Sequence, residues 1–233
     1  MMQNAQVIHN RLTKEIPVNK KTAEELGTSM SVIEEFMDRR GILGQLENIN
    51  IAGARAAKIV GNMLSFSKNS KSIKEKNKID ELIDQTIELA ENDYDLKNEY
   101  DFKKIKIVRE YDSDIPALFC EKSKIQQVLF NILKNASQAM NQARKDDLPK
   151  IITIRLQKLS KMVIIEIEDN GPGIDTEIQK RIFEPFFTTK SVDKGTGLGL
   201  SVSYYIIVDD HRGKMAVESA LGKGTKFIIK LPL

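Results

Sequence analysis

The sequence predicts an α+β protein in which an N-terminal helical hairpin precedes a two-layer α/β sandwich with a mixed sheet. Two observations support this prediction. Before residue 64, apolar and small residues recur at alternating steps of four and three, which is the heptad seam of a helix in a bundle. After residue 78, helical periodicity and short strand patterns alternate along the chain, in an order typical of a two-layer α/β sandwich.

The N-terminal region is expected to be helical. Its seam consists of Ile42, Leu46, Ile49, Gly53, Ala56, Val60 and Met63. This pattern fits a helix packed within one monomer and a dimer-forming hairpin about equally well. Upstream, Met1–Leu12 is expected to be a helix that Pro17 interrupts, and Thr22–Leu26 and Met30–Arg39 are expected to be further helical segments.

A charged stretch separates this region from the rest of the chain. Residues 67–78 read SKNSKSIKEKNK, with one apolar residue in twelve, which is typical of a solvated connector. We therefore divide the chain into a helical region at 1–68, a connector at 69–78 and a second domain at 79–233.

The second domain is expected to contain two main helices, a third shorter helix and six strands. The helices are expected at Ile79–Glu91, Lys122–Ala143 and Leu200–Asp209. The strands are expected at Ile105–Val108, Ala117–Phe119, Ile151–Leu156, Met162–Ile167, Met215–Val217 and Phe227–Leu231. The tripeptide Leu159-Ser160-Lys161 is expected to form the turn between the third and fourth strands.

The composition is that of a soluble globular protein, with 41% hydrophobic and 30% charged residues. A net charge of only +3 argues against nucleic-acid binding. The single cysteine excludes an intramolecular disulfide and fits a reducing compartment. No apolar run is long enough to span a bilayer. We expect a cytoplasmic fragment without direct membrane contact. A membrane-anchored parent protein, of which this chain is a piece, is compatible with this expectation.

Three polar segments are candidates for binding a ligand. Asn131 and Asn135 lie four residues apart and share one face of the predicted long helix, where an amide oxygen could bind Mg²⁺. Asp169 follows a strand and precedes a glycine turn, and its carboxylate could accept a hydrogen bond from an exocyclic amine such as the adenine N6. In isolation, the first segment is better explained as asparagines on a helix surface, and a turn without function is the alternative explanation of the second.

The third segment is Gly195–Ser201, in which three glycines alternate before a predicted helix. Bare backbone amides beside a helix N-terminus form a cradle for phosphate. The segment lacks the Gly-Lys-Ser/Thr ending of a P-loop, and no βαβ unit opens with it, so neither of those nucleotide motifs is present.

Taken together and in this order, these segments resemble the sequence boxes of the sensor histidine kinase ATP-binding domain, from about Lys78 to Leu233. The resemblance rests on Asn131–Ala136 as the N box, Asp169–Ile174 and Gly195–Leu200 as the two G boxes, Ile182–Lys190 as the F box, and the closing segments His211–Gly213 and Gly224–Pro232. It implies the fold shared by gyrase, Hsp90, histidine kinase and MutL ATPases, with a mobile lid over ATP.

The resemblance also implies roles for individual residues. Asp169 would fix the adenine, Asn135 would coordinate Mg²⁺ with Asn131 beside it, and Lys134 and Lys190 would offset phosphate charge. Hydrolysing relatives carry a glutamate at the position of Asn131, and an amide cannot activate water, which favours phosphoryl transfer. We assign Asn131, Asn135 and Lys190 to catalysis, and expect the ATP site to comprise Asn131, Lys134, Asn135, Asp169, Gly171, Gly173, Ile174, Lys190, Gly195, Thr196, Gly197, Leu198, Gly199, Leu200 and Thr225.

The N-terminal helices resemble the dimerisation and phosphotransfer hairpin, which implies a homodimer and a response regulator receiver domain as partner. The phosphoacceptor box reads histidine, then an acidic residue, with proline five places after the histidine. His9 is followed by Asn10, and Lys14 stands five places on, so we expect a chain cut after that box. His9 acting as the acceptor and a natural chain without one are the alternatives. A nucleotide-dependent scaffold and a serine kinase of the anti-sigma-factor type are the rival functions.

Overall fold

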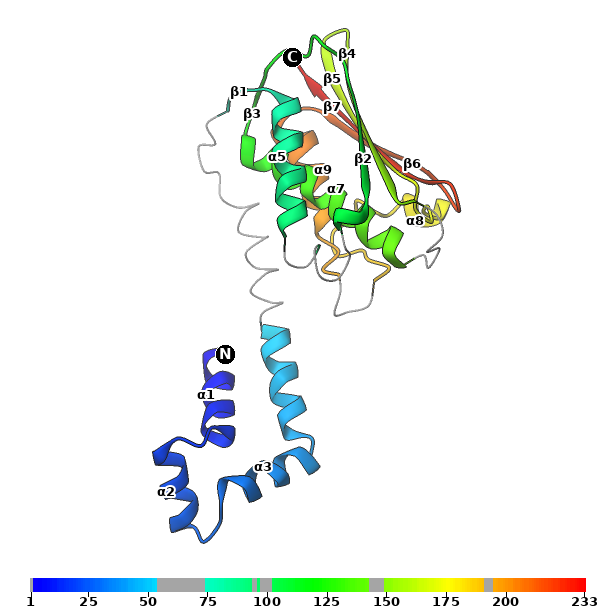
Figure 1. Cartoon of the computed structure of the whole chain (residues 1–233). Helices are drawn as coiled ribbons and strands as arrows, with labels where there is room; N and C mark the ends of the chain where they lie inside the picture. The colour runs from blue at the N-terminus through cyan, green and yellow to red at the C-terminus, as the bar shows by residue number, and fades with distance from the viewer. Residues whose placement is uncertain (1, 54–73, 94–95, 97–101, 143–148, 191–194) are drawn as a thin grey trace. The chain divides into compact units, whose positions relative to one another are not determined.

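The computed structural model describes residues 2–53, 74–93, 96, 102–142, 149–190 and 195–233. The chain divides into two compact units, residues 1–68 and 69–233. The first is helical in its described part, and the second combines the sheets with the remaining helices (Figure 1).

The helical unit contains α1 (Met2–Thr13), α2 (Pro17–Glu25), α3 (Met30–Arg39) and a further helical stretch over residues 42–53. The first helix ends before Pro17, as expected, but the polar stretch after Pro17 does not interrupt helical structure, because Pro17 is the first residue of α2. Proline suits that position, since the first helical N–H has no partner within the helix and the ring fixes a helical φ. The residues Ala56, Val60 and Met63 of the predicted seam lie outside the described residues.

A glycine follows the end of α2, and a serine caps the start of α3. Gly27 follows α2 with a left-handed φ of 70°, and the Thr28 N–H donates back to the Ala23 carbonyl. The Ser29 hydroxyl then caps α3 by accepting from the Val32 N–H. In the described part of this unit, the core is small and several large apolar side chains are exposed. The buried side chains include Ala23, Met30, Met37 and Leu46, whereas Val18, Leu26, Val32 and Phe36 are exposed.

The second unit is built on a five-stranded mixed sheet, as predicted. Its strands lie in the order β2 (Lys106–Tyr111), β4 (Ile151–Leu159), β5 (Met162–Asp169), β7 (Gly224–Pro232) and β6 (Lys214–Ala220). The β2–β4 pair is parallel, and the other three pairs are antiparallel. The β4–β5 turn is tight, with Ser160 at a φ of 56°.

Three helices cover one face of this sheet (Figure 1): α5 (Ile79–Asn92), α7 (Lys122–Gln142) and α9 (Gly199–Tyr205). The α7 helix contacts both other helices and β5, which makes it the central helix of the layer. The predicted apolar face of α5 is confirmed. All four of its members, Ile79, Ile83, Ile87 and Ala90, are buried.

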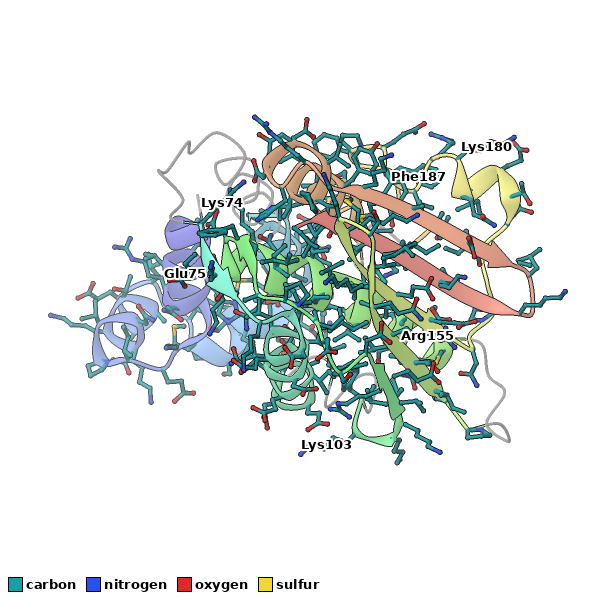
Figure 2. All side chains as sticks on the ribbon, turned by 90° about the horizontal axis from the view of Figure 1, so that it is seen from above. Lys74, Glu75, Lys103, Arg155, Lys180 and Phe187 are labelled. Atoms are coloured by element: carbon teal, nitrogen blue, oxygen red, sulfur yellow. The ribbon has the colours of Figure 1, made fainter. Side chains whose placement is uncertain are left out.

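The opposite face of the sheet is charged. Buried Ile152, Ile154 and Leu156 alternate along β4 with residues that point the other way, among them Arg155. Arg155, labelled in Figure 2, pairs with Glu110 at 2.7 Å. One apolar face under helices and one charged face give the two-layer sandwich that the sequence predicts.

The second unit also contains elements that the sequence does not predict. Strand β1 (Glu75–Asn77) lies in the stretch expected to be a connector and pairs antiparallel with β3 (Leu118–Cys120) in a separate two-stranded sheet. Helix α9 continues into a π-helical turn at Ile206–Asp210, and short helical segments occupy Thr176–Gln179 (α8) and Phe102–Lys104 (η1). In the described part of the chain, no helix is both long and apolar enough to cross a bilayer.

Candidate functional site

The site is organised along α7, which presents amide side chains at regular intervals. Asn131, Asn135 and Gln138 are separated by four and three residues, so they lie on the same side of the helix. Ile132 and Leu133 are only 1% exposed and fix the helix in the core. The apolar residues therefore hold α7 in place, while its amides form a polar row.

Asn131 joins α7 to the start of α9. Its side-chain nitrogen donates to the Gly199 carbonyl oxygen at 3.1 Å and to the Ser203 hydroxyl at 3.2 Å. The Ser203 hydroxyl donates in turn to the Gly199 carbonyl at 2.9 Å. Both N–H groups of this amide are engaged within the protein, so only its oxygen is available for a ligand.

Asn135 contacts Lys190, which the sequence places 55 residues further along the chain. The Lys190 ammonium donates to the Asn135 Oδ1 at 3.0 Å and also to the Gln138 Oε1. Burial, together with the positive charge of Lys134, lowers the pKa of Lys190 to about 8. The structure therefore brings the predicted residues Asn135, Lys134 and Lys190 together.

Asp169 ends β5 and is only 5% exposed. Its Oδ1 accepts from the Gly171 N–H at 2.8 Å, and the backbone of Thr225 on β7 also donates to the carboxylate. Burial raises the pKa of Asp169 to about 6, against the effect of these two hydrogen bonds. A buried carboxylate with spare acceptor capacity can bind an amine that enters from outside.

The turn after Asp169 requires glycine. A Cβ on Gly171 would lie 2.7 Å from the Asp169 Oδ1 and 3.1 Å from the Met140 Cγ. Gly173 has a φ of 74°, and a Cβ there would collide with the Ala220 carbonyl oxygen. The Ile174 N–H is fixed by the Ser219 hydroxyl at 2.8 Å. This turn is therefore packed between the end of α7 and the hairpin of β6 and β7.

The glycine segment at 195–199 lies against the F-box segment and α7. A Cβ on Gly195 would be 2.7 Å from the Thr188 Oγ1, and Gly197, with a φ of 66°, leaves no room beside the Phe186 backbone. The ring of Phe183 in the F-box segment packs against that of Tyr204 in α9 in a tilted arrangement, with centroids 5.1 Å apart and an interplanar angle of 40°. Thr196 and Leu200 are half-buried, and Leu198 is buried as an apolar anchor.

The predicted residues thus line one helix in a fixed order. Asn131 meets the start of α9, Asn135 meets Lys190, and Met140, further along α7, adjoins Gly171 and through it Asp169. From Asn131 to Met140 the helix advances about 14 Å. The glycine segment and the basic residues lie towards one end of this row, and the buried carboxylate lies at the other.

A divalent cation would have few protein ligands here. Among the described residues, no group of three histidine, cysteine, aspartate or glutamate side chains could hold a metal ion. Among the described side chains, the amide oxygens of Asn135 and Gln138 contact the Lys190 ammonium. Mg²⁺ binds typically through one or two protein oxygens with substrate phosphates and water. This donor set fits a cation that arrives with phosphates.

Four residues of the candidate site were not predicted from the sequence. Ser203 and Ser219 form hydrogen bonds with the predicted residues, and Met140 adjoins Gly171. Gln138 was missed although its position, three residues after Asn135, places it on the same helix face. That spacing could have identified Gln138 from the sequence. Ser203, Ser219 and Met140 join the site through tertiary contacts, which the sequence pattern does not show.

Comparison with known proteins places this chain in a family. The family described as histidine kinase-, DNA gyrase B- and HSP90-like ATPase matches residues 120–233. The catalytic domain of the histidine kinase ThkA, solved in a nucleotide-free form, is 30% identical and aligns with a TM-score of 0.56 over 68% of this chain and 95% of that domain. The chain belongs to the histidine kinase family.

Two curated histidine kinase relatives extend the similarity. Sporulation kinase E of Bacillus subtilis is 35% identical over 77% of this chain, and the signal transduction histidine-protein kinase AtoS of Escherichia coli is 33% identical over 88% of it. These matches span 22% and 30% of the two relatives. The chain therefore corresponds to about a fifth to a third of these longer kinases, and it contains their ATP-binding catalytic domain.

Proposed function

We propose that the chain binds Mg-ATP along α7 and, within a homodimeric cytoplasmic histidine kinase, transfers the γ-phosphoryl group to a histidine for relay to the receiver domain of a response regulator. The arrangement of α7 is the observation that carries this proposal. Its amides connect a buried carboxylate at one end with a lysine and a glycine segment at the other.

Each residue has a physical role in this proposal. The Asp169 carboxylate accepts a hydrogen bond from the adenine amine, and Gly171 and Gly173 let the backbone approach the base. The Asn135 oxygen is the protein ligand of Mg²⁺, which neutralises phosphate charge when bound. Lys190 and Lys134 supply further positive charge, and the amides of Gly195–Gly199 close over the phosphates at the start of α9. The half-buried residues Thr196, Leu200 and Ile174 and the buried Thr225 shape the rest of the site.

Asn131 favours transfer over hydrolysis. An amide has no basic lone pair, so it cannot take a proton from water at neutral pH. In the structure its N–H groups hold the start of α9 instead. Positioning and charge neutralisation are most of what phosphoryl transfer requires from a protein, and the site supplies both.

The assembly of the whole kinase is inferred from its relatives. ThkA has also been solved in complex with the response regulator TrrA, in a structure that shares this fold with a TM-score of 0.60. The heptad seam of the helical unit supports a homodimer. These partners and the cytoplasmic location belong to the proposal for the longer protein.

Calorimetric titration of the chain with ADP and Mg²⁺ tests the nucleotide site. Asp169→Asn replaces one of the two acceptor oxygens with a donor, and Asn135→Asp changes the metal ligand and adds charge beside the phosphates. We expect each to weaken affinity about tenfold to a hundredfold, since a hydrogen bond to a charged group contributes about 1.5–3 kcal/mol. Asn92→Asp, on the exposed end of α5, is the matched control and should leave affinity unchanged. Affinity equal to wild type in both site variants would refute the assignment.

A further inference from the structure

Lys190 is held by two amides rather than one. Its ammonium donates to the Asn135 Oδ1 at 3.0 Å and to the Gln138 Oε1 on the next turn of α7. Gln138 is only 6% exposed, although glutamine is ordinarily a surface residue. A buried amide needs a partner, because leaving it unsatisfied is costly. The buried position of Gln138 is therefore matched to Lys190.

The backbone of Lys190 is also fixed. Its N–H donates to the Thr188 hydroxyl at 3.1 Å, and a Cβ on Gly195 would lie 3.1 Å from the Lys190 Cβ. The lysine therefore extends from a constrained segment between the glycine segment and α7. Among the described contacts, the Lys190 ammonium meets α7 at these two amide oxygens.

Asn135 cannot serve a metal ion and Lys190 at the same time without a cost. An ammonium at hydrogen-bonding distance and a divalent cation bound to the same oxygen would be two cations within a few ångströms of each other, in a partly buried site where repulsion is poorly screened. When the metal binds Asn135, the ammonium has to move to another acceptor. Gln138 offers that acceptor one turn further along the same helix.

On the basis of the proposed Mg-ATP site, we propose that Gln138 is a positioning residue that holds Lys190 when Asn135 coordinates the metal, and that it thereby sets how strongly nucleotide binding depends on Mg²⁺. Gln138 itself touches neither the metal nor the phosphates in this proposal. It acts through Lys190, so every effect of changing it should require the lysine.

The measured quantity is the metal factor, defined as the ADP dissociation constant in EDTA divided by that in Mg²⁺, for the full 233-residue chain. Gln138→Met keeps the length of the side chain but removes the acceptor, so Lys190 competes with Mg²⁺ for Asn135. We expect the metal factor to fall about three- to tenfold. Gln138→Glu restores an acceptor with a charge and should raise the metal factor to the wild-type value or above it.

The decisive comparison repeats the Gln138→Met change in a Lys190→Met background. We expect the effect on the metal factor to disappear there, because the competing ammonium is gone. A merely structural role for Gln138 would lower ADP affinity in EDTA and in Mg²⁺ alike, with or without Lys190. An effect that persists in the Lys190→Met background, or the absence of any effect in both backgrounds, would overturn the inference. Failure of the proposed function would appear differently, as no ADP binding by the wild-type chain.

Discussion

Two buried titratable side chains in the second unit, Asp169 and His211, make the stability of the folded state depend on pH in opposite directions. Burial raises the pKa of Asp169 to about 6, so the folded state favours its neutral form. Burial also lowers the pKa of His211, so the folded state favours the neutral imidazole. Stability linked to Asp169 is lost as pH rises towards 6, whereas stability linked to His211 is lost as pH falls below about 6.5.

His211 provides a test at the scale of one residue. Its Nδ1 lies 2.8 Å from the Ile206 carbonyl, and its Nε2 accepts from the Glu121 N–H at 3.1 Å. Protonation would place a second N–H against that donor. We expect His211→Gln to lower the free energy of unfolding at pH 7.5 by about 1–3 kcal/mol and to reduce the loss of stability between pH 6.5 and 5.

Thermal or urea unfolding across pH 5–8 measures this effect. Because Asp169 is present in both proteins, its opposite contribution cancels when the variant is compared with wild type. Equal pH dependence of the two proteins below pH 6.5 would show that the imidazole does not carry the predicted linkage.

At the residue scale, the sequence predicted those site residues that stand in motifs. Asn135 and Lys190 are 55 residues apart, yet both belong to boxes and they meet in the structure. Ser219 and Met140 stand in no motif, and they join the site only because the β6–β7 hairpin and the end of α7 pack beside the turn at Gly171–Gly173. Such contacts depend on register and packing, which local patterns do not encode.

At the scale of elements, helices with a strong apolar periodicity were predicted best from the sequence. The prediction for α5 agrees with the structure to within one residue at each end, and α7 begins at Lys122 as predicted, because each helix has a continuous apolar face. The predicted end of α7, Ala143, lies outside the described residues. Strand β1, Glu-Lys-Asn, is exposed over most of its length and has no apolar alternation, so it gave no signal. The π-helical turn after α9 depends on how Ile206 and Ile207 enter the core, and no propensity predicts it.

The helical stretch over residues 42–53 allows a test of the proposed dimer. Leu46 of its seam is buried within the unit, whereas Ile49 is 48% exposed and free to meet a second copy. A charge buried in an apolar interface is costly. We expect Ile49→Glu to convert the dimer to a monomer in light scattering, without loss of helical circular dichroism.

Ile51 supplies a matched control for that experiment. It is 49% exposed, but two residues along the helix it points to nearly the opposite side. Ile51→Glu should leave the dimer intact. A wild-type chain that is monomeric at high concentration would contradict the dimer, and equal dissociation by both variants would show that the seam is not its specific interface.

At the scale of the whole molecule, the chain combines a proposed nucleotide site with histidines that do not match the phosphoacceptor box. It contains two histidines. His211 is 5% exposed and both of its ring nitrogens are engaged. His9 lies on α1, but Asn10 follows it where the acceptor box has an acidic residue, and Lys14 stands where that box has proline. An acidic neighbour would take the imidazole proton and raise the nucleophilicity of the ring, and Asn10 cannot do so.

We therefore expect the chain to bind Mg-ATP without phosphorylating itself. The measurement is incubation with γ-labelled ATP and Mg²⁺, followed by separation on an alkaline gel, with nucleotide binding verified by calorimetry on the same sample. Acid-labile label that disappears in His9→Ala would make His9 the acceptor and contradict the prediction. Acid-stable label would instead indicate a serine kinase. Absence of label together with nucleotide binding agrees with the prediction, because a site built for positioning and charge neutralisation still needs a nucleophile that it does not itself contain.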